Sequence, residues 1–334
     1  MKIILDAMGG DFAPDSTIEG AVLALNEIKD CRVVLVGDGD LIKRGLKNKE
    51  YDKNRLSIVE TTEVITNDDI PTKAIKQKKD SSLVVGFRML KENMGDVLVS
   101  AGSTGAVMAG GLLLLGRIKG VDRPALPTVL RVNDTQIMVI DSGANTMCKP
   151  VNYVQFGIMG STYMKEVYNL RNPRVGLLNI GAEEKKGNEI TKQAYLLLNE
   201  SNLNFVGNIE GNDVLKNKAD VIVCDGFSGN ILLKFAEGLG EFFKDGLKDI
   251  FCSNMRTKIS YLVLKDPLKN FFKGLDPSEV GGVPLLGIDG NIIKCHGRSD
   301  KKTIKNAIKT ANNFAKGRLT EKIEDKLNIA LLKK

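Results

Sequence analysis

The sequence predicts an α/β protein with three layers, in which a mostly parallel β-sheet lies between two layers of helices. Two observations lead to this expectation. Short apolar runs alternate with longer helical patterns, and such strand–helix–strand repetition requires right-handed crossovers between parallel strands. Most of the short runs are continuously apolar, which is typical of strands that helices cover on both faces.

The expected elements follow one another along the whole chain. Strands are expected at Lys2–Asp6, Arg32–Val36, Leu56–Glu60, Asp96–Ser100, Gln136–Asp141, Arg174–Asn179, Leu203–Gly207 and Asp220–Asp225. Helices are expected at Ser16–Lys29, Ser81–Asn93, Thr104–Leu115 and Asn188–Leu198, the first of them capped by Asp15 or Ser16. No repeat or Pro/Ser-rich linker interrupts residues 1–334, which we interpret as one α/β unit, with two lobes as the alternative.

The segment Phe235–Leu275 departs from this rhythm and is expected to contain two helices, with a helical hairpin over residues 241–275. The break is expected at Lys265-Asp266-Pro267, because proline cannot continue a helix and restricts the residue before it. Cations and apolar residues alternate around the break, the apolar ones including Leu262, Val263, Leu264 and Leu268. An apolar tip with a cationic collar is the pattern of an interfacial membrane contact, but the residues alone favour an ordinary helix pair on the body or across a dimer.

The formal net charge of +7 is concentrated in two stretches. Lys301–Lys334 holds ten Lys or Arg and three acids, and Arg256–Lys273 holds five cations and one acid. Such basic faces attract acidic proteins, anionic lipid or nucleic acid. We expect no nucleic-acid partner, because neither stretch contains a recognised nucleic-acid-binding pattern.

The cysteine pattern and the apolar runs predict a cytoplasmic protein. The five cysteines are scattered without a C-x-x-C pair, which argues against a disulfide framework or a structural zinc. No signal peptide is expected at Met1, and the run Gly105–Gly116 is shorter than the about 20 residues that span a bilayer. His296 is the only histidine, so carboxylates alone remain as metal ligands and no metal site is expected.

Polar residues followed by glycine mark the ends of five predicted strands. The first strand ends at Asp6, and Gly9, Gly10 and Asp11 follow within one turn. The other four ends carry Ser100, Asp141, Asn179 and Asp225. Because the carboxyl ends of parallel strands meet at one edge of a sheet, we expect these residues to converge there. Bare glycine backbone at that edge allows a substrate to approach closely.

The segment Gly102-Ser103-Thr104-Gly105 is the best candidate for an anion-binding loop. A glycine-rich loop that opens a helix offers N–H donors and roughly +0.5 charge, and two hydroxyls add to them here. The pattern is neither a P-loop nor G-x-G-x-x-G, so a small anion such as phosphate fits at least as well as a nucleotide. Lysines in PTKAIKQKKDSS and GAEEKKGNE are expected at the same edge, with one of Lys185 and Lys186 paired to an acid.

No pattern marks a nucleophile on the protein. There is no G-x-S-x-G, no cysteine has a neighbouring histidine, and a Ser-His-Asp triad has only His296 as its base. The residues alone leave His296 equally compatible with a structural role. Anion-binding loops without a nucleophile suggest that a bound phosphate attacks an electrophile that the protein aligns with it.

Six stretches resemble, in order, signature segments of the bacterial phosphate acyltransferase family of phospholipid synthesis. They are MKIILDAMGGDFAP, SAGSTGA, DSGAN followed by Cys-Lys-Pro, NIGAEEKKGNE, CDGFSGNILLK and GGVPLLGIDG…HGRSD. The resemblance implies an isocitrate/isopropylmalate dehydrogenase-like fold with a protruding helical hairpin, a homodimer, and no cofactor. It implies that acyl-(acyl carrier protein) and inorganic phosphate give acyl phosphate, which feeds a membrane glycerol-3-phosphate acyltransferase. It also favours peripheral association with the inner face of the cell membrane.

The resemblance implies roles for individual residues. SAGSTGA would form part of the phosphate or acyl-carbonyl pocket, and Asn145 of DSGAN is placed with Asp141 among the phosphate- or substrate-binding residues. Lys186 would be a cationic active-site residue, and the remaining positions that would line the cleft are Asp225, Asn230 and His296. Two departures stand out, because the family usually has Asn at Ser103 and Val-Asp at Thr146-Met147. The second departure removes an acid.

Three functions are compatible with these patterns. The first is direct attack of bound phosphate on a carrier-bound thioester, and the basic stretches suit an acidic acyl carrier protein. An acyl-CoA-dependent phosphate acyltransferase is the alternative, which predicts a nucleotide pocket. A metal- and NAD-dependent dehydrogenase of the related fold is a third, which predicts dependence on a divalent metal and nicotinamide.

Overall fold

The strands of the computed structural model belong to two β-sheets rather than to the single expected sheet. The structure describes residues 1–132, 135–273, 281–317 and 319–331. Unit 1 comprises Met1–Leu126, Lys165–Asn169 and Val280–Lys334, and unit 2 comprises Pro127–Met164 and Leu170–Glu279. Strand β11, which comes from near the end of the chain, pairs with β4. The edge of β4 is therefore occupied, and the strands from the middle of the chain form a second sheet.

The sheet of unit 1 has the strand order β10-β11-β4-β1-β2-β3 and is parallel except for β10. Its strands are β1 (Lys2–Asp6), β2 (Arg32–Gly37), β3 (Leu56–Glu60), β4 (Val97–Ser100), β10 (Val283–Pro284) and β11 (Ile292–Lys294). Its helices are α1 (Asp15–Glu27), α2 (Gly39–Leu46), α3 (Pro71–Gln77), α4 (Ser82–Lys91), α5 (Thr104–Gly110), α11 (Lys301–Lys316) and α12 (Leu319–Leu331).

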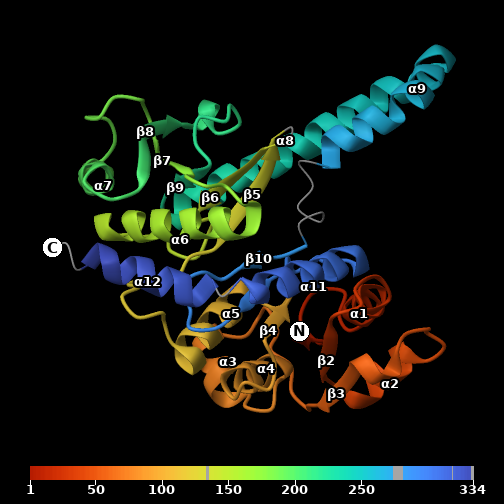
Figure 1. The fold of residues 1–334 in the computed structure, drawn as a ribbon. Coiled ribbons are helices and arrows are strands. Elements are labelled where there is room, and N and C mark those ends of the chain that lie inside the picture. Colours follow the sequence, from red (N-terminus) through yellow and green to blue (C-terminus); the bar gives the residue numbers. More distant parts are fainter. Residues whose placement is uncertain (133–134, 274–280, 318, 332–334) are drawn as a thin grey trace. The chain divides into compact units, whose positions relative to one another are not determined.

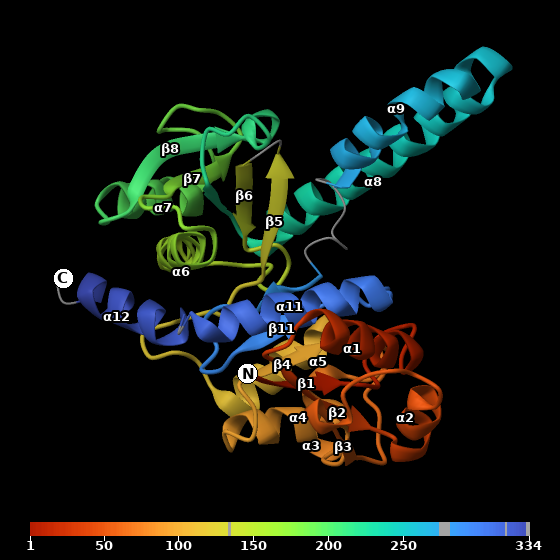
Figure 2. The same cartoon turned by 45° about the vertical axis from the view of Figure 1, so that its right-hand side comes forward.

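Helices cover both faces of this sheet, as the apolar strands predict. Helices α1 and α11 lie side by side on one face, and α4 packs on the other (Figures 1 and 2). Gly20 of α1 permits the close approach, because a Cβ there would lie 2.5 Å from the Cβ of Ile304. On the opposite face, Phe87 of α4 is fully buried in a cluster with Ile4 and Leu98.

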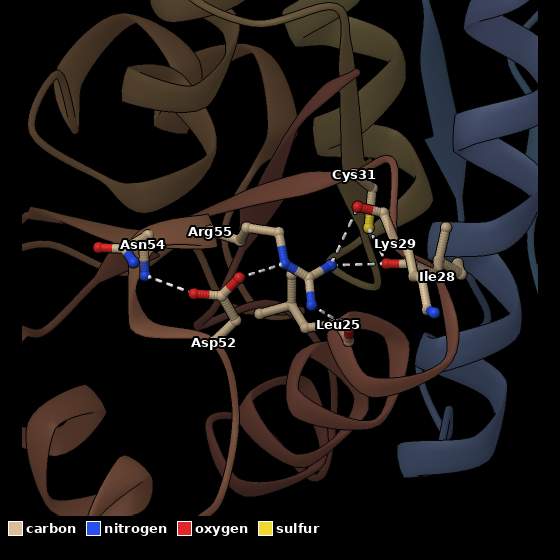
Figure 3. A network of polar contacts seen from close by, with 7 residues as sticks. All are labelled: Leu25, Ile28, Lys29, Cys31, Asp52, Asn54 and Arg55. Atoms are coloured by element: carbon tan, nitrogen blue, oxygen red, sulfur yellow. Dashed lines mark hydrogen bonds and ion pairs between the residues drawn. The ribbon is translucent and has the colours of Figure 1, made fainter.

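Arg55 closes the C-terminal end of α1, as Figure 3 shows. Its guanidinium donates to the carbonyl oxygens of Leu25 and Ile28 at 2.7 Å each. The side chain of Asp52 holds the guanidinium in place by accepting from Nε at 2.9 Å. The last carbonyls of a helix have no partner within the helix, so these bonds satisfy acceptors that otherwise need water.

The sheet of unit 2 has the order β5-β6-β9-β7-β8, with only the β5–β6 pair antiparallel. Its strands are β5 (Pro127–Val132), β6 (Thr135–Ile140), β7 (Arg174–Asn179), β8 (Asn204–Glu210) and β9 (Val221–Val223). Its helices are α6 (Pro150–Tyr168), α7 (Glu189–Asn199), α8 (Gly226–Cys252) and α9 (Met255–Lys273). Gly157 and Gly160 seat α6 against the sheet, where Val175, Met138 and Val221 approach their backbone.

The predicted α/β class with mostly parallel pairing is confirmed. The eight expected strands are present with small shifts at their ends. Three strands were not expected: β5 begins with a proline on a sheet edge, and β10 and β11 are only two and three residues long. The expected helix over 104–115 ends as α5 at Gly110 and continues as a single π-helical turn over Gly111–Leu115.

The expected position of the hairpin break is wrong. Helices α8 and α9 lie side by side (Figures 1 and 2), and the turn between them falls at Ser253-Asn254, with Pro267 inside α9. The side chain of Asn254 accepts from the N–H groups of Arg256 and Thr257 at 3.0 Å each, which caps the second helix. Leu262, Val263 and Leu264 therefore lie within α9 rather than at the tip.

Candidate functional site

Three buried polar residues occupy the carboxyl ends of three neighbouring strands in unit 1. Asp6 ends β1, Ser100 ends β4, and Lys294 ends β11, directly opposite Ser100 in the pairing register. Ser82 and Ser100 donate to the two oxygens of Asp6 at 2.6 and 2.7 Å. Burial raises the pKa of Asp6, although these hydroxyls and the backbone N–H groups of Met8 and Gly9 oppose the shift. Asp6 thus organises this edge.

The loop after β1 lies across the ends of β4 and β11. A Cβ on Gly9 would lie 2.4 Å from Asp6 Oδ2 and 2.7 Å from the backbone N of Gly102. Gly10 has φ +109°, where a side chain is strained, and faces Ala101 and the carbonyl of Gly297. The N–H of Asp11 donates to that carbonyl at 2.8 Å, while its own carboxylate is exposed. Both glycines are therefore required by the close packing of this loop against neighbouring side chains and backbone.

The loop Gly102–Gly105 lies beside this first loop, as expected. The N–H of Gly102 donates to Ser100 Oγ at 3.0 Å, which ties the loop to Asp6 through one hydroxyl. Ser103 stands at the N-cap position of α5 without a side-chain cap bond, and Thr104 is exposed. A Cβ on Gly105 would lie 2.7 Å from Pro71, which begins α3. Of the lysines in PTKAIKQKKDSS, Lys73 and Lys76 lie within α3.

His296 follows β11 in the same unit and is exposed. Its Nδ1 accepts from the N–H of Arg298 at 3.1 Å. The side chain of Lys294, two residues earlier, is 6% exposed and donates to the carbonyl of Cys295. Unit 1 thus brings together the Asp6 edge, both glycine loops and His296, with a buried lysine that the sequence pattern did not single out.

Asp141 organises the corresponding loop in unit 2. It follows β6, is fully buried, and is joined to Ile140 by a cis peptide bond. Its Oδ1 accepts from the N–H groups of Gly143 and Ala144 at 3.2 and 3.0 Å. Its Oδ2 accepts from the backbone and side-chain nitrogens of Asn145 at 2.7 and 2.8 Å. These contacts are those of a turn-forming acceptor.

Asp225 caps α8 and contacts a buried tyrosine. Its Oδ1 accepts from the N–H of Ser228 at 2.8 Å, and its Oδ2 accepts from Tyr153 Oη at 3.3 Å. Burial, followed by the charge of Asp225, raises the pKa of Tyr153. Asn230, one turn into the helix, is exposed, and Gly143 packs at ordinary distance against it. The Asp141 loop and the start of α8 therefore form one cluster.

Asn179 ends β7, next to β9 in the sheet of unit 2. Its Nδ2 donates to the carbonyl of Lys186 and to Asn208 Oδ1, both at 3.1 Å, which closes the loop between them. The Lys186 side chain is exposed, and its methylenes lie over Gly181. The expected ion pair in GAEEKKGNE is wrong, because neither Lys185 nor Lys186 makes one with any residue that the structure describes.

The structure therefore groups the predicted residues by unit. Asp6 and both glycine loops join His296 in unit 1, whereas Asp141, Asn145, Asn179, Lys186, Asp225 and Asn230 share the carboxyl edge of β6-β9-β7 in unit 2. Sequence reasoning missed Lys294, Ser82 and Tyr153. The one available signal for Lys294 was a lysine that ends the apolar run of NIIKCHG. A serine or a tyrosine inside a helical pattern carries no such signal.

This chain is similar to known proteins along nearly its whole length. A family model described as "Fatty acid synthesis protein" matches residues 1–322. The phosphate acyltransferase of Acetivibrio thermocellus is 53% identical over 323 residues, which cover 97% of this chain and 95% of that relative.

Solved structures of lower identity share the fold. A phosphotransacetylase from Streptococcus pyogenes has a TM-score of 0.63 at 15% identity and covers 94% of both chains. A 4-hydroxythreonine-4-phosphate dehydrogenase from Salmonella typhimurium has a TM-score of 0.53 at 13% identity, covering 94% of this chain and 99% of that one. The predicted dehydrogenase-like α/β fold is thereby confirmed.

Proposed function

This chain belongs to the fatty acid synthesis protein family, together with the phosphate acyltransferases that it resembles. We propose that it transfers the acyl group of acyl-(acyl carrier protein) to inorganic phosphate. The products are acyl phosphate and free carrier. The observation that carries this proposal is the Asp6 edge of unit 1, where two glycine loops bring bare backbone onto a row of buried polar residues. Such an edge suits a small anion held by backbone donors.

The proposed reaction needs no covalent intermediate on the protein. A phosphate oxygen attacks the thioester carbonyl carbon, the new C–O bond forms, and the C–S bond breaks. The carrier thiolate leaves and takes up a proton. Phosphate is partly dianionic at neutral pH, so alignment of the two substrates and stabilisation of the oxyanion supply the rate enhancement. The glycine loops of unit 1, with Gly9, Gly10 and Gly102–Gly105, are proposed to hold the phosphate.

The exposed cationic and amide groups are proposed to contact substrate, each within its own unit. Lys186, Asn230 and His296 are exposed and therefore accessible to substrate. Asp225 is proposed to fix the start of α8, since both its oxygens accept hydrogen bonds there. Asp141 and Asn145 are proposed to shape the neighbouring loop through their mutual bonds.

A membrane contact through α9 is part of the proposal. Leu262 and Val263 are 73% and 76% exposed, Leu264 is exposed, and Leu268 is half-buried. The nearby cations Arg256, Lys258 and Lys265 suit an anionic surface. Within the described ranges, no helix has the length and hydropathy needed to cross a bilayer. We propose peripheral binding at the inner face of the cell membrane, where a glycerol-3-phosphate acyltransferase takes the product.

The exposed apolar ridge of α8 supports a homodimer. Side chains at intervals of four residues are exposed along it, namely Phe227, Ile231, Phe235, Leu239 and Phe243, with Phe242 exposed beside the last. An unpaired apolar ridge of this length is unusual on a monomer. We propose that a second copy of the chain covers it, which sedimentation of the purified protein tests.

The basic face proposed to meet acyl carrier protein is that of α9. On α11, Lys305 and Lys316 pair with Glu27 and Asp30 at 2.7 and 2.5 Å, so much of the C-terminal charge is neutralised. Among the described side chains of α9, the cations make no such pair. Charge reversal at Arg256 and Lys258 is expected to raise KM for the carrier substrate and leave KM for phosphate unchanged.

The test of the function is mass spectrometry of the protein incubated with long-chain acyl-(acyl carrier protein) and phosphate. Phosphate-dependent release of free carrier together with acyl phosphate supports the proposal. Turnover with acyl-CoA and not with the carrier substrate would establish the alternative donor. Turnover of a hydroxyacid with metal and NAD would instead overturn the acyl-transfer assignment.

A further inference from the structure

Lys294 is a lysine in an environment that seldom holds one. It ends β11 after Ile292 and Ile293, which are fully buried, and its own residue is 6% exposed. Lysine is almost never buried to this degree without a partner of opposite charge, because removing an ammonium from water is costly. Its presence at the end of an apolar strand therefore calls for a compensating group.

The described protein provides little compensation. The ammonium donates to the carbonyl of Cys295, and no carboxylate of the described residues lies within ion-pair distance of it. Asp6 is near enough to act on it electrostatically, but the two oxygens of Asp6 accept from Ser82 and Ser100. Burial lowers the pKa of Lys294, opposed by the charges of Cys295, Asp6 and Asp11.

The strand that ends at Lys294 pairs with the strand that leads into one of the glycine loops. Lys294 and Ser100 are register partners, and the N–H of Cys295 donates to the carbonyl of Ser100 at 2.9 Å. The loops that follow β1, β4 and β11 meet over these strand ends, where Gly10 contacts both Ala101 and the carbonyl of Gly297. A cation with spare donor capacity thus ends a strand beside the loops of bare backbone that we assign to phosphate.

We propose that Lys294 is the buried cation of the phosphate subsite, with its ammonium directed at a phosphate oxygen held by the glycine loops. The inference rests on the proposed function and adds to it the charged group that binds this substrate. A phosphate dianion supplies the missing counter-charge, and a point-like ammonium with three donors suits it. Apolar burial strengthens the attraction, because the surroundings screen it less than water does.

The experiment combines thermal unfolding with steady-state kinetics, using inorganic phosphate as the probe. Wild type is compared with Lys294→Met, Lys294→Gln and Lys294→Arg. The control is Lys326→Met on α12, a half-buried lysine whose pKa burial also lowers and which contacts neither glycine loop. We expect phosphate to raise the Tm of wild type and of the control, because a ligand that binds only the folded state stabilises it.

The Lys294→Met and Lys294→Gln proteins are expected to lose this phosphate-dependent rise in Tm. Their KM for phosphate is expected to rise about tenfold or more, consistent with loss of a charged hydrogen bond. Without phosphate, Lys294→Met is expected to unfold at the wild-type Tm or above it, since the burial cost of the charge is relieved. Lys294→Arg is expected to retain part of the response.

The opposite results would overturn the inference. A wild-type phosphate response in Lys294→Met, or in the more conservative Lys294→Gln should the former not fold, means that Lys294 balances Asp6 and does not bind substrate. An equal loss of the phosphate-dependent rise in Tm in Lys326→Met would mean that the effect is not specific to Lys294, which also overturns the inference. If wild type makes no acyl phosphate while its phosphate response depends on Lys294, the proposed function fails and the anion site stands.

Discussion

At the scale of single residues, the site is built from buried acids that organise backbone. Asp6 ends β1 and Asp141 directly follows β6, and each accepts hydrogen bonds at both oxygens. Both carboxylates are buried, and their oxygens are engaged by hydrogen bonds within the protein. Their shared role is to hold glycine-containing loops in place, so substitutions in these loops are expected to act on activity through position.

Gly9→Ala tests the close packing of the first loop. The new Cβ would lie 2.4 Å from Asp6 Oδ2 and 2.7 Å from the backbone N of Gly102, so one loop must move. A shift of about 1 Å at a reactive centre costs about 10²-fold in rate. We expect kcat/KM for phosphate to fall by about that factor. The matched control is Gly240→Ala on α8, which meets no atom within 4 Å, and equal activity of the two variants would contradict the packing argument.

Asp225→Asn tests whether the carboxylate only caps α8 or also takes part in the reaction. Asparagine is as good an N-cap as aspartate, so we expect the Tm of the protein to change little. If Asp225 only fixes the start of α8, acyl phosphate formation is expected to stay within about threefold of wild type. A loss of a hundredfold or more at unchanged Tm would instead assign a chemical role to the carboxylate.

At the scale of elements, two polar side chains join segments that lie far apart in sequence. Arg55 links the 3-10 turn before β3 to the end of α1, and Arg174 links the start of β7 to Asp220 before β9. Both use the several donors of a guanidinium, which a lysine does not reproduce. The stability of each unit is expected to depend on its own arginine.

Arg55→Met is expected to destabilise unit 1 by about 1–3 kcal/mol, because the carbonyls of Leu25 and Ile28 lose a charged donor. Chemical denaturation followed by circular dichroism measures the change. Lys53→Met, an exposed neighbour in the same turn, is the control and is expected to stay within about 0.5 kcal/mol of wild type. An equal change in unfolding free energy in the two variants would contradict the capping role of Arg55.

The pair of Arg174 and Asp220 predicts a pH dependence of stability. Burial alone raises the pKa of Asp220, but the bonds and charge of Arg174 outweigh it and hold the pKa below the usual 3.8. A lowered carboxyl pKa stabilises the folded state above pH 3.8, and this stabilisation is lost as pH falls through the folded-state pKa. Arg174→Met is therefore expected to be destabilising at pH 7, and the difference from wild type is expected to shrink as pH falls below 3.8. A pH-independent difference in unfolding free energy would contradict this.

Of the helices and strands, the sequence predicted the long strands and missed the short strands and the hairpin turn. Long apolar runs such as the one ending at Asp6 marked their strands correctly, because burial on both faces leaves a clear signal. Strands of two or three residues leave no such signal, and one of them, β11 (Ile292–Lys294), occupies the edge of β4 in the sheet of unit 1. The hairpin break was misplaced because the Asn254 cap determines the turn and Pro267 lies inside a helix.

At the scale of the whole molecule, the predicted residues divide between two units with their own sheets. Six signature stretches identified the family correctly, because an ordered set of motifs is more specific than any one loop. Lys294 was missed because its burial depends on a strand formed from the other end of the chain. Burial of a lone charge is a property of the fold, and composition does not reveal it.

The exposed apolar face of α9 belongs to this scale, because it concerns where the molecule works. Leu262→Asp combined with Val263→Asp is expected to reduce sedimentation with anionic lipid vesicles about tenfold or more, since both side chains are exposed. The rate of acyl phosphate formation in solution is expected to be unchanged at saturating acyl-(acyl carrier protein), because the new charges on α9 act only on KM for the acidic carrier. The control is Leu215→Asp, an exposed leucine elsewhere in unit 2, and an equal loss of vesicle binding there would contradict a specific contact through α9.

The central claim is that bound phosphate, and no side chain, attacks the thioester. Its most direct test is the intact mass of the protein after incubation with acyl-(acyl carrier protein) in the absence of phosphate. We predict an unchanged mass and no release of free carrier until phosphate is added. A protein that gains the mass of one acyl group, with release of one equivalent of carrier before phosphate is present, would contradict the account.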